Sequence, residues 1–188
     1  MPPRVKITKN DIIKTAVELV RTDGENSINA RSIASVLNCS TQPIFSNFAT
    51  MQQLKEAVIA DAYCRYLGFL KNEAESGKYH QYKSYGMAYI RFAKEEKELF
   101  KLLFMRNRQG EDISPTADFD ASIELIMNAN AVTKEKATLM HMEMWACVHG
   151  IASMLATSFL SLEWELISDM LTDVYKGIQS GLLKENKL

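Results

Sequence analysis

The sequence contains few residues that break helices, and this scarcity limits the fold classes open to it. Only four prolines occur in 188 residues, at positions 2, 3, 43 and 115, so long stretches of the chain contain none. The alternation of apolar and polar residues that marks a half-buried strand is not sustained anywhere. An all-α fold is therefore predicted.

Cysteines and long apolar runs are also scarce. The three cysteines, Cys39, Cys64 and Cys147, are an odd number without paired metal-ligand spacing, so reduced thiols are expected. The apolar run at 150–162, which contains no charged residue or histidine, is shorter than the roughly 20 residues of a membrane-spanning helix. The N-terminus lacks the apolar core of a signal peptide. These absences predict a cytoplasmic protein with no membrane partner.

No arrangement of side chains suggests catalysis. His141 and His149 share one helical stripe but are eight residues apart, about 12 Å along a helix, which is too far to share a metal ion. Phosphate-binding loops, zinc-protease motifs and nucleophilic serine motifs are missing from the sequence. We therefore expect no catalytic residue, no metal site and no cofactor, and the protein is predicted not to be an enzyme.

The net charge of −1 is divided unevenly along the chain. Residues 1–50 carry six basic and four acidic side chains, a net +2, which leaves −3 for the remainder. The sign suits an N-terminal part that faces DNA, although the excess is small. Because non-specific affinity grows with the number of phosphates neutralised, one copy should bind weakly and need a partner copy.

Residues 28–54 have the pattern of two short helices joined by a tight turn. Apolar residues recur at helical spacing in Ala30–Leu37, and Asn38 suits the left-handed conformation that ends a helix. Ser40 is expected to cap the next helix, about 41–47, and Pro43 fits its first turn.

This second helix is too short to be stable alone. Ile44 and Phe48 lie four residues apart and can hold one of its faces against the first helix. The opposite face is polar except for Phe45. A short helix with these two faces has the geometry of a helix-turn-helix recognition helix, although two amphipathic helices at this spacing also occur in many other all-α proteins.

A preceding helix is predicted over 7–24, capped by Thr8 and ended by Gly24. It would supply the third helix of a small N-terminal DNA-binding domain. With this helix included, residues 12–58 resemble the TetR family of transcriptional regulators. Phe45 stands where the family usually has tyrosine, and Met51 where it commonly has a lysine that contacts the DNA backbone. The residues that carry the resemblance are Ala16, Leu19, Gly24, Ile28, Arg31 to Ala34, Leu37, Ser40, Ile44, Phe45, Phe48 and Leu54.

A second resemblance lies at Trp145 to Gly150, which is similar to the Trp-x-x-x-His-Gly signature of the WHG class of TetR-type C-terminal domains. Together the two resemblances imply a helix-turn-helix DNA-binding domain at 1–50 and a helical bundle for ligand binding and dimerisation at 51–188. The expected DNA-facing residues are Arg31, Ser40, Thr41, Gln42, Pro43, Phe45, Ser46 and Asn47.

The predicted body, 51–188, has long helices over 50–75, 133–160 and 163–183 and a loop over 107–116. The small residues Ala146, Gly150, Ser153 and Thr157 form a stripe that suits either close approach of a partner helix or packing within one chain. Methionines and aromatic residues in the body fit either an ordinary core or an adaptable apolar pocket. The expected ligand-binding residues are Tyr85, Tyr89, Phe104, Met144, Trp145 and His149, with a structural role for His149 as the alternative.

The sequence thus favours a ligand-responsive homodimeric repressor. It is expected to bind a palindromic operator in double-stranded DNA and to be released by an apolar small molecule. The alternative is a protein of the same fold that binds DNA constitutively and recruits a protein partner. This alternative lacks an internal cavity and has exposed apolar patches instead.

Overall fold

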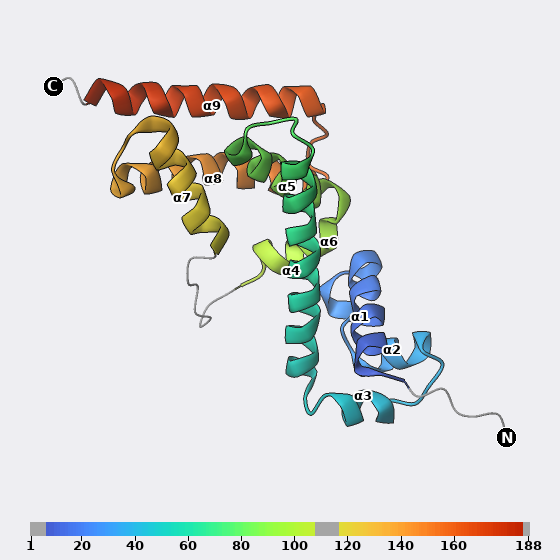
Figure 1. The fold of residues 1–188 in the computed structure, drawn as a ribbon. Helices are drawn as coiled ribbons and strands as arrows, with labels where there is room; N and C mark the ends of the chain where they lie inside the picture. The colour runs from blue at the N-terminus through green and yellow to red at the C-terminus, as the bar shows by residue number, and fades with distance from the viewer. Residues whose placement is uncertain (1–6, 108–116, 186–188) are drawn as a thin grey trace. The chain divides into compact units, whose positions relative to one another are not determined.

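The computed structural model describes residues 7–107 and 117–185, and every regular element within these ranges is a helix (Figure 1). The all-α prediction is confirmed. Residues 108–116, most of the predicted loop, lie outside the described residues. The chain divides into two compact units, unit 1 (Met1–Leu67 and Glu96–Arg106) and unit 2 (Gly68–Glu95 and Asn107–Leu188). A functional domain boundary at residue 50 stays a prediction.

The first helix of unit 1, α1 (Lys9–Asp23), begins and ends as its sequence predicts. The hydroxyl of Thr8 accepts a hydrogen bond from the backbone of Asp11 at 3.2 Å, and the Asp11 carboxylate accepts one from the backbone of Thr8 at 2.9 Å. This reciprocal capping satisfies two amide groups that the first turn leaves without helical partners. Gly24 ends the helix with φ of 78°, a conformation in which a side chain would be strained.

The next two helices, α2 (Ala30–Val36) and α3 (Gln42–Asn47), are joined by a tight turn. Asn38 has φ of 52°, so the predicted left-handed helix end is confirmed. Pro43 lies in the first turn of α3, as expected. The prediction that Ser40 caps α3 is wrong. Thr41 precedes the helix in helical backbone conformation, and no side chain caps α3.

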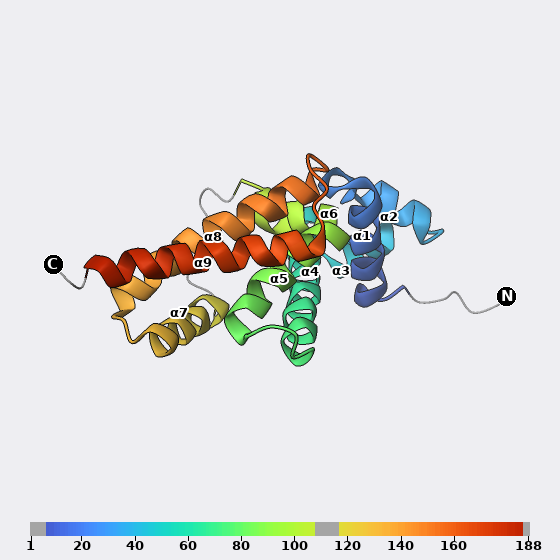
Figure 2. The same ribbon diagram turned by 90° about the horizontal axis from the view of Figure 1, so that it is seen from above.

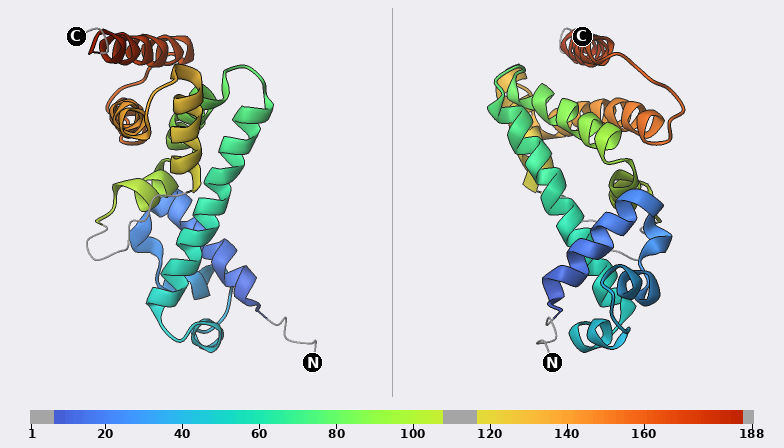
Figure 3. Two further views of the ribbon diagram at one scale, coloured as in Figure 1. Left: turned by 60° about the vertical axis from the view of Figure 1, so that its left-hand side comes forward. Right: turned by 90° about the vertical axis from the view of Figure 1, so that its right-hand side faces the viewer.

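Unit 1 is built around the first part of α4 (Met51–Glu75), which α1 crosses (Figure 3). Thr50 precedes α4, and its hydroxyl accepts a hydrogen bond from the amide of Gln53 at 3.1 Å. A short helix, α6 (Lys97–Phe100), and a π-helix over Lys101–Met105 complete the unit. Its fully buried apolar side chains include Ile12, Val20, Ile33, Ile44, Leu54, Val58, Leu99 and Phe100.

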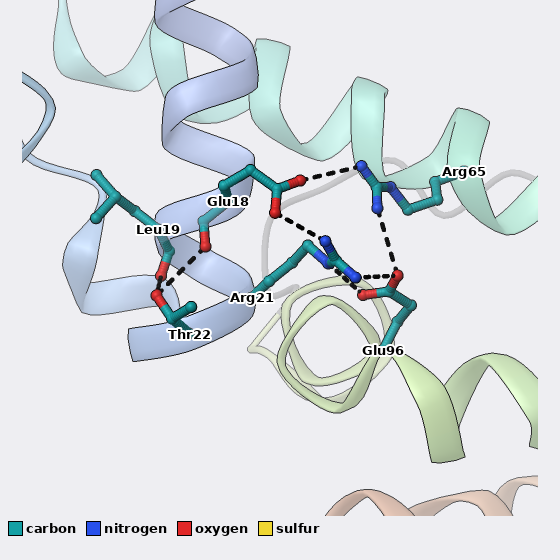
Figure 4. Close-up of polar contacts among 6 residues, drawn as sticks. All are labelled: Glu18, Leu19, Arg21, Thr22, Arg65 and Glu96. Atoms are coloured by element: carbon teal, nitrogen blue, oxygen red, sulfur yellow. Dashed lines mark hydrogen bonds and ion pairs between the residues drawn. The ribbon is translucent and has the colours of Figure 1, made fainter. Parts of the chain in front are cut away.

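A ring of four charged side chains joins α1, α4 and the start of α6 inside unit 1 (Figure 4). Arg21 donates to both oxygens of Glu96, at 2.7 and 2.9 Å, and to Glu18 at 2.7 Å. Arg65 lies opposite and donates to Glu96 and Glu18, each at 3.3 Å. Positive and negative groups alternate around the ring. The side chain of Glu96 is only 9% exposed, so the two guanidinium groups replace the water that would otherwise stabilise its carboxylate.

Unit 2 holds α5 (Gln81–Glu95), α7 (Ala117–Asn130), α8 (Lys134–Ala156) and α9 (Trp164–Glu185). Figure 2 shows α8 and α9 running side by side. Helix α8 ends four residues earlier than predicted, and Ser158 beyond it has φ of 56°. Gly86 on α5 has so little space that an added Cβ would lie 3.3 Å from Val148. Helices α5 and α8 are thus packed so closely here that a larger residue would require Val148 to shift by a few tenths of an ångström.

The charge ring leads to a testable difference between its two carboxylates. Replacing Glu96 by glutamine leaves two arginines without their buried anion, and we expect the free energy of unfolding to fall by about 1.5–3 kcal/mol. Glu18→Gln is the matched control, because Glu18 is 56% exposed and should cost at most about 1 kcal/mol. Urea unfolding measures both. Equal losses would show that burial of Glu96 is not what gives the ring its strength.

Candidate functional site

Helix α3 presents two different faces. Ile44 and Phe48 are 0% and 2% exposed and hold one face against the core of unit 1. Gln42, Phe45 and Ser46 are exposed on the rest of the helix, and the Phe45 side chain is 53% exposed. The predicted division of this helix into an anchored and a free face is confirmed.

Two polar side chains of α3 are already engaged by their own helix. The hydroxyl of Ser46 donates to the carbonyl of Gln42 at 2.9 Å. The amide nitrogen of Asn47 donates to the carbonyl of Pro43 at 2.7 Å. These bonds fix the rotamers of Ser46 and Asn47, and among the exposed residues of α3 they leave Gln42 and Phe45 with the longest outward reach.

Basic side chains are sparse around α3. Arg31, exposed on α2, is the one basic residue in positions 28–54. Lys55 on α4 is paired with Glu25, and Arg21 belongs to the charge ring. Met51, the first residue of α4, is half-buried and uncharged. The surface of α2 and α3 therefore has shape and hydrogen-bonding groups but little positive charge.

Two tyrosine–histidine pairs join α5 to α8 in unit 2. The Tyr82 hydroxyl lies 3.0 Å from Nδ1 of His141, and the Tyr89 hydroxyl lies 2.9 Å from Nδ1 of His149. The indole of Trp145 stacks on His149 with ring centroids 4.9 Å apart and planes at 15°. Burial lowers the pKa of both histidines and raises the pKa of both tyrosines. At neutral pH both imidazoles are therefore uncharged and both hydroxyls keep their protons, and the tautomer of each imidazole sets which partner donates the hydrogen bond.

Only some of the predicted ligand-binding residues come together. Tyr89 and Trp145 both contact His149. Met144 is buried on α8, while the Tyr85 hydroxyl accepts a hydrogen bond from Gln81 at 3.0 Å on an exposed part of α5. Phe104 belongs to unit 1, where its ring packs against those of Tyr66 and Phe100.

Sequence reasoning missed the second pair, Tyr82 and His141. Its signal was present, because two tyrosines seven residues apart in one helix face two histidines eight residues apart in another. Both spacings are close to two helical turns, so the pairs repeat along the interface. His141 is also in edge-to-face contact with Phe119, at 4.9 Å between ring centroids.

Apolar side chains are exposed along α8 and α9. Leu139 and Met142 lie one turn apart on α8 and are 53% and 45% exposed, and Leu166 on α9 is 49% exposed. The predicted small-residue stripe continues along α8, where an added Cβ at Gly150 would have no neighbour within 4 Å. The same holds at Gly177 on α9. These exposed apolar side chains are available to a partner.

A family model described as the tetracyclin repressor-like C-terminal domain matches residues 83–174. The matched range contains Tyr89, His141 and His149, and Tyr82 lies one residue before it. Residues 83–174 are thus similar to the C-terminal domain of tetracyclin repressor-like proteins. The match includes Trp145 to Gly150, and membership of the narrower WHG class stays a prediction. Proteins of this family are regulators, not enzymes.

Solved structures share the fold of this chain over nearly its whole length. A TetR-like transcriptional regulator from Rhodococcus sp. RHA1 is 17% identical, with a TM-score of 0.67 over 93% of this chain and 96% of that one. A protein of unknown function from Rhodococcus sp. RHA1 is 18% identical, with a TM-score of 0.70 over 96% and 97%. No curated protein sequence matches the chain.

Other kinds of site were sought in the part of the chain that the structure describes. Within 7–107 and 117–185, no three histidine, cysteine or acidic side chains lie close enough together to hold a metal ion. None of the helices in these ranges is sufficiently long and apolar to span a membrane. The three cysteines form no disulfide with one another.

The half-buried His141 and His149 make the stability of this protein sensitive to acid. Their folded-state pKa values lie below the usual 6.5, so the unfolded chain binds more protons as the pH falls through that value. We expect the free energy of unfolding to fall between about pH 7 and pH 5, and His141→Gln/His149→Gln to reduce this loss. Chemical unfolding at a series of pH values measures it. His80→Gln, at an exposed histidine, is the control, and an equal effect there would contradict the assignment.

Proposed function

We propose that this TetR-like regulator is a homodimeric repressor that works in the cytoplasm, binds a palindromic operator in double-stranded DNA and is released by an apolar small molecule. The observation that carries the proposal is the anchored helix α3, whose buried Ile44 and Phe48 leave Gln42 and Phe45 directed outward. A helix held in this way can enter the major groove. Arg31 and the start of α4 would then lie beside the DNA backbone.

The low positive charge near α3 supports a dimer. Each phosphate contact contributes to affinity, and one copy has few basic side chains with which to make them. Two copies that read an inverted repeat combine their binding energies on one operator. The exposed Leu139, Met142 and Leu166, together with small residues on α8 and α9, provide an apolar surface on which a second copy would pack.

The chemical class of the proposed effector is inferred from the side chains around His149. The Tyr89–His149 pair offers hydrogen-bonding groups beside the Trp145 ring and the buried Met144, which suits an apolar compound with one polar end. Such a compound releases DNA only if it binds one conformation of the dimer more tightly than another. The alternative, a constitutive DNA-binding protein that recruits a partner, is favoured by the 75% exposed Phe159 after α8.

The dimer surface predicts a variant that separates assembly from folding. Leu139→Lys/Met142→Lys places two cations on an exposed face of α8, so each copy should still fold but not associate. Analytical ultracentrifugation should give single chains, and affinity for an operator selected from random DNA should fall by about a hundredfold or more. Leu67→Lys, at an exposed leucine of α4, should leave both unchanged. A selected site without an inverted repeat would count against the dimer.

The start of α4 predicts a gain of affinity. Met51→Lys adds a cation where α4 would face the DNA backbone, so binding should strengthen on all sequences. A plot of log affinity against log salt should steepen by about one unit for each added phosphate contact. Met51→Gln, which adds no charge, is the control. An unchanged slope would mean that Met51 does not lie near phosphate.

The effector region predicts selective loss of binding. In a thermal-shift screen of apolar compounds, those with a hydrogen-bonding end should raise the Tm of the wild-type protein and weaken its operator binding. His149→Phe should reduce the Tm shift while leaving dimerisation and DNA binding intact, and His80→Phe should have no effect. Operator affinity that no stabilising compound alters would favour the constitutive alternative.

A further inference from the structure

The recognition helix exposes one large apolar side chain to solvent. Phe45 is 53% exposed, whereas its neighbours Ile44 and Phe48 are almost fully buried. The fold of unit 1 therefore does not need the Phe45 ring for its core. A phenylalanine in such a position keeps a ring in water that would gain free energy from an apolar partner.

The chemistry of that partner follows from what a phenyl ring lacks. It has no hydrogen-bond donor or acceptor, so it cannot pair with a phosphate oxygen or with the polar groups on a base edge. In the major groove, the apolar group on a base edge is the C5 methyl of thymine. We propose that Phe45 recognises a thymine methyl in each operator half-site. This inference rests on the proposed DNA-binding function.

The neighbouring side chains of α3 support this assignment. Gln42 precedes Phe45 by three residues, so the two side chains project from one face of the helix. The Ser46 hydroxyl and the Asn47 amide nitrogen are held by carbonyls of their own helix. A glutamine amide can pair with N6 and N7 of adenine. Gln42 and Phe45 together therefore select a half-site that contains A·T pairs, with adenine recognised by the amide and thymine by the ring.

The test removes the methyl group and nothing else. After an operator has been selected from random DNA, each thymine is replaced in turn by deoxyuridine, which keeps every hydrogen-bonding group of the base. We expect one thymine in each half-site at which the wild-type protein loses affinity by about threefold to tenfold, the order expected for burying one methyl group. The other thymines should tolerate the replacement.

Two variants assign the effect to its residue. Phe45→Ala should bind thymine and deoxyuridine operators equally well, because the ring that contacts the methyl is gone. Gln42→Ala should bind more weakly yet keep the wild-type deoxyuridine penalty. Both residues are exposed, so circular dichroism melting should show that both variants remain folded.

The outcomes separate two kinds of failure. If the protein selects no operator, the proposed function fails and this inference fails with it. If an operator is bound but deoxyuridine is tolerated at every thymine, the inference alone is wrong. It is also wrong if Phe45→Ala keeps the penalty, because the methyl is then recognised by another residue, or if Phe45→Ala weakens all sequences equally, which indicates contact with deoxyribose.

Discussion

The burial of Ile44 and Phe48 holds in place a helix that has no stability of its own. Six residues form fewer than two turns, and a helix of that length is unstable in water without tertiary contacts. The ammonium group of Lys9 on α1 also lies over the Phe48 ring, 5.0 Å from its centroid. The geometry of α3 is thus determined by α1 and by the core of unit 1, and its outward residues are not needed to hold the helix in place.

The sequence predicted the local structure best where one residue determines it. Thr8 and Gly24 bound α1, and Asn38 takes the left-handed conformation that ends α2. The cap of α3 was wrong because Thr41 adopts helical backbone angles, so the helical path starts one residue after Ser40 without using its hydroxyl. In a turn this tight, tertiary contacts of Ile44 outweigh the small preference for a capping side chain.

The effector region was only partly predictable, for a different reason. Composition could identify tyrosine, tryptophan and histidine as candidates, but the contacts among them depend on how α5 and α8 align. Tyr89 and His149 were paired by that alignment, and so were Tyr82 and His141, which the sequence analysis did not associate. Phe104 could not be placed in advance, because the segment that carries it belongs to unit 1.

That segment, Glu96–Arg106, also makes unit 1 discontinuous in the chain. During synthesis, α1 to α4 emerge from the ribosome well before Glu96, Leu99 and Phe100. The nascent N-terminal part therefore lacks the buried carboxylate of the charge ring and part of its core. Unit 1 reaches its native state only after α5 has been synthesised. A gene fragment cut after α4 therefore encodes an incomplete core, and transplanting unit 1 onto another scaffold would require α6 as well.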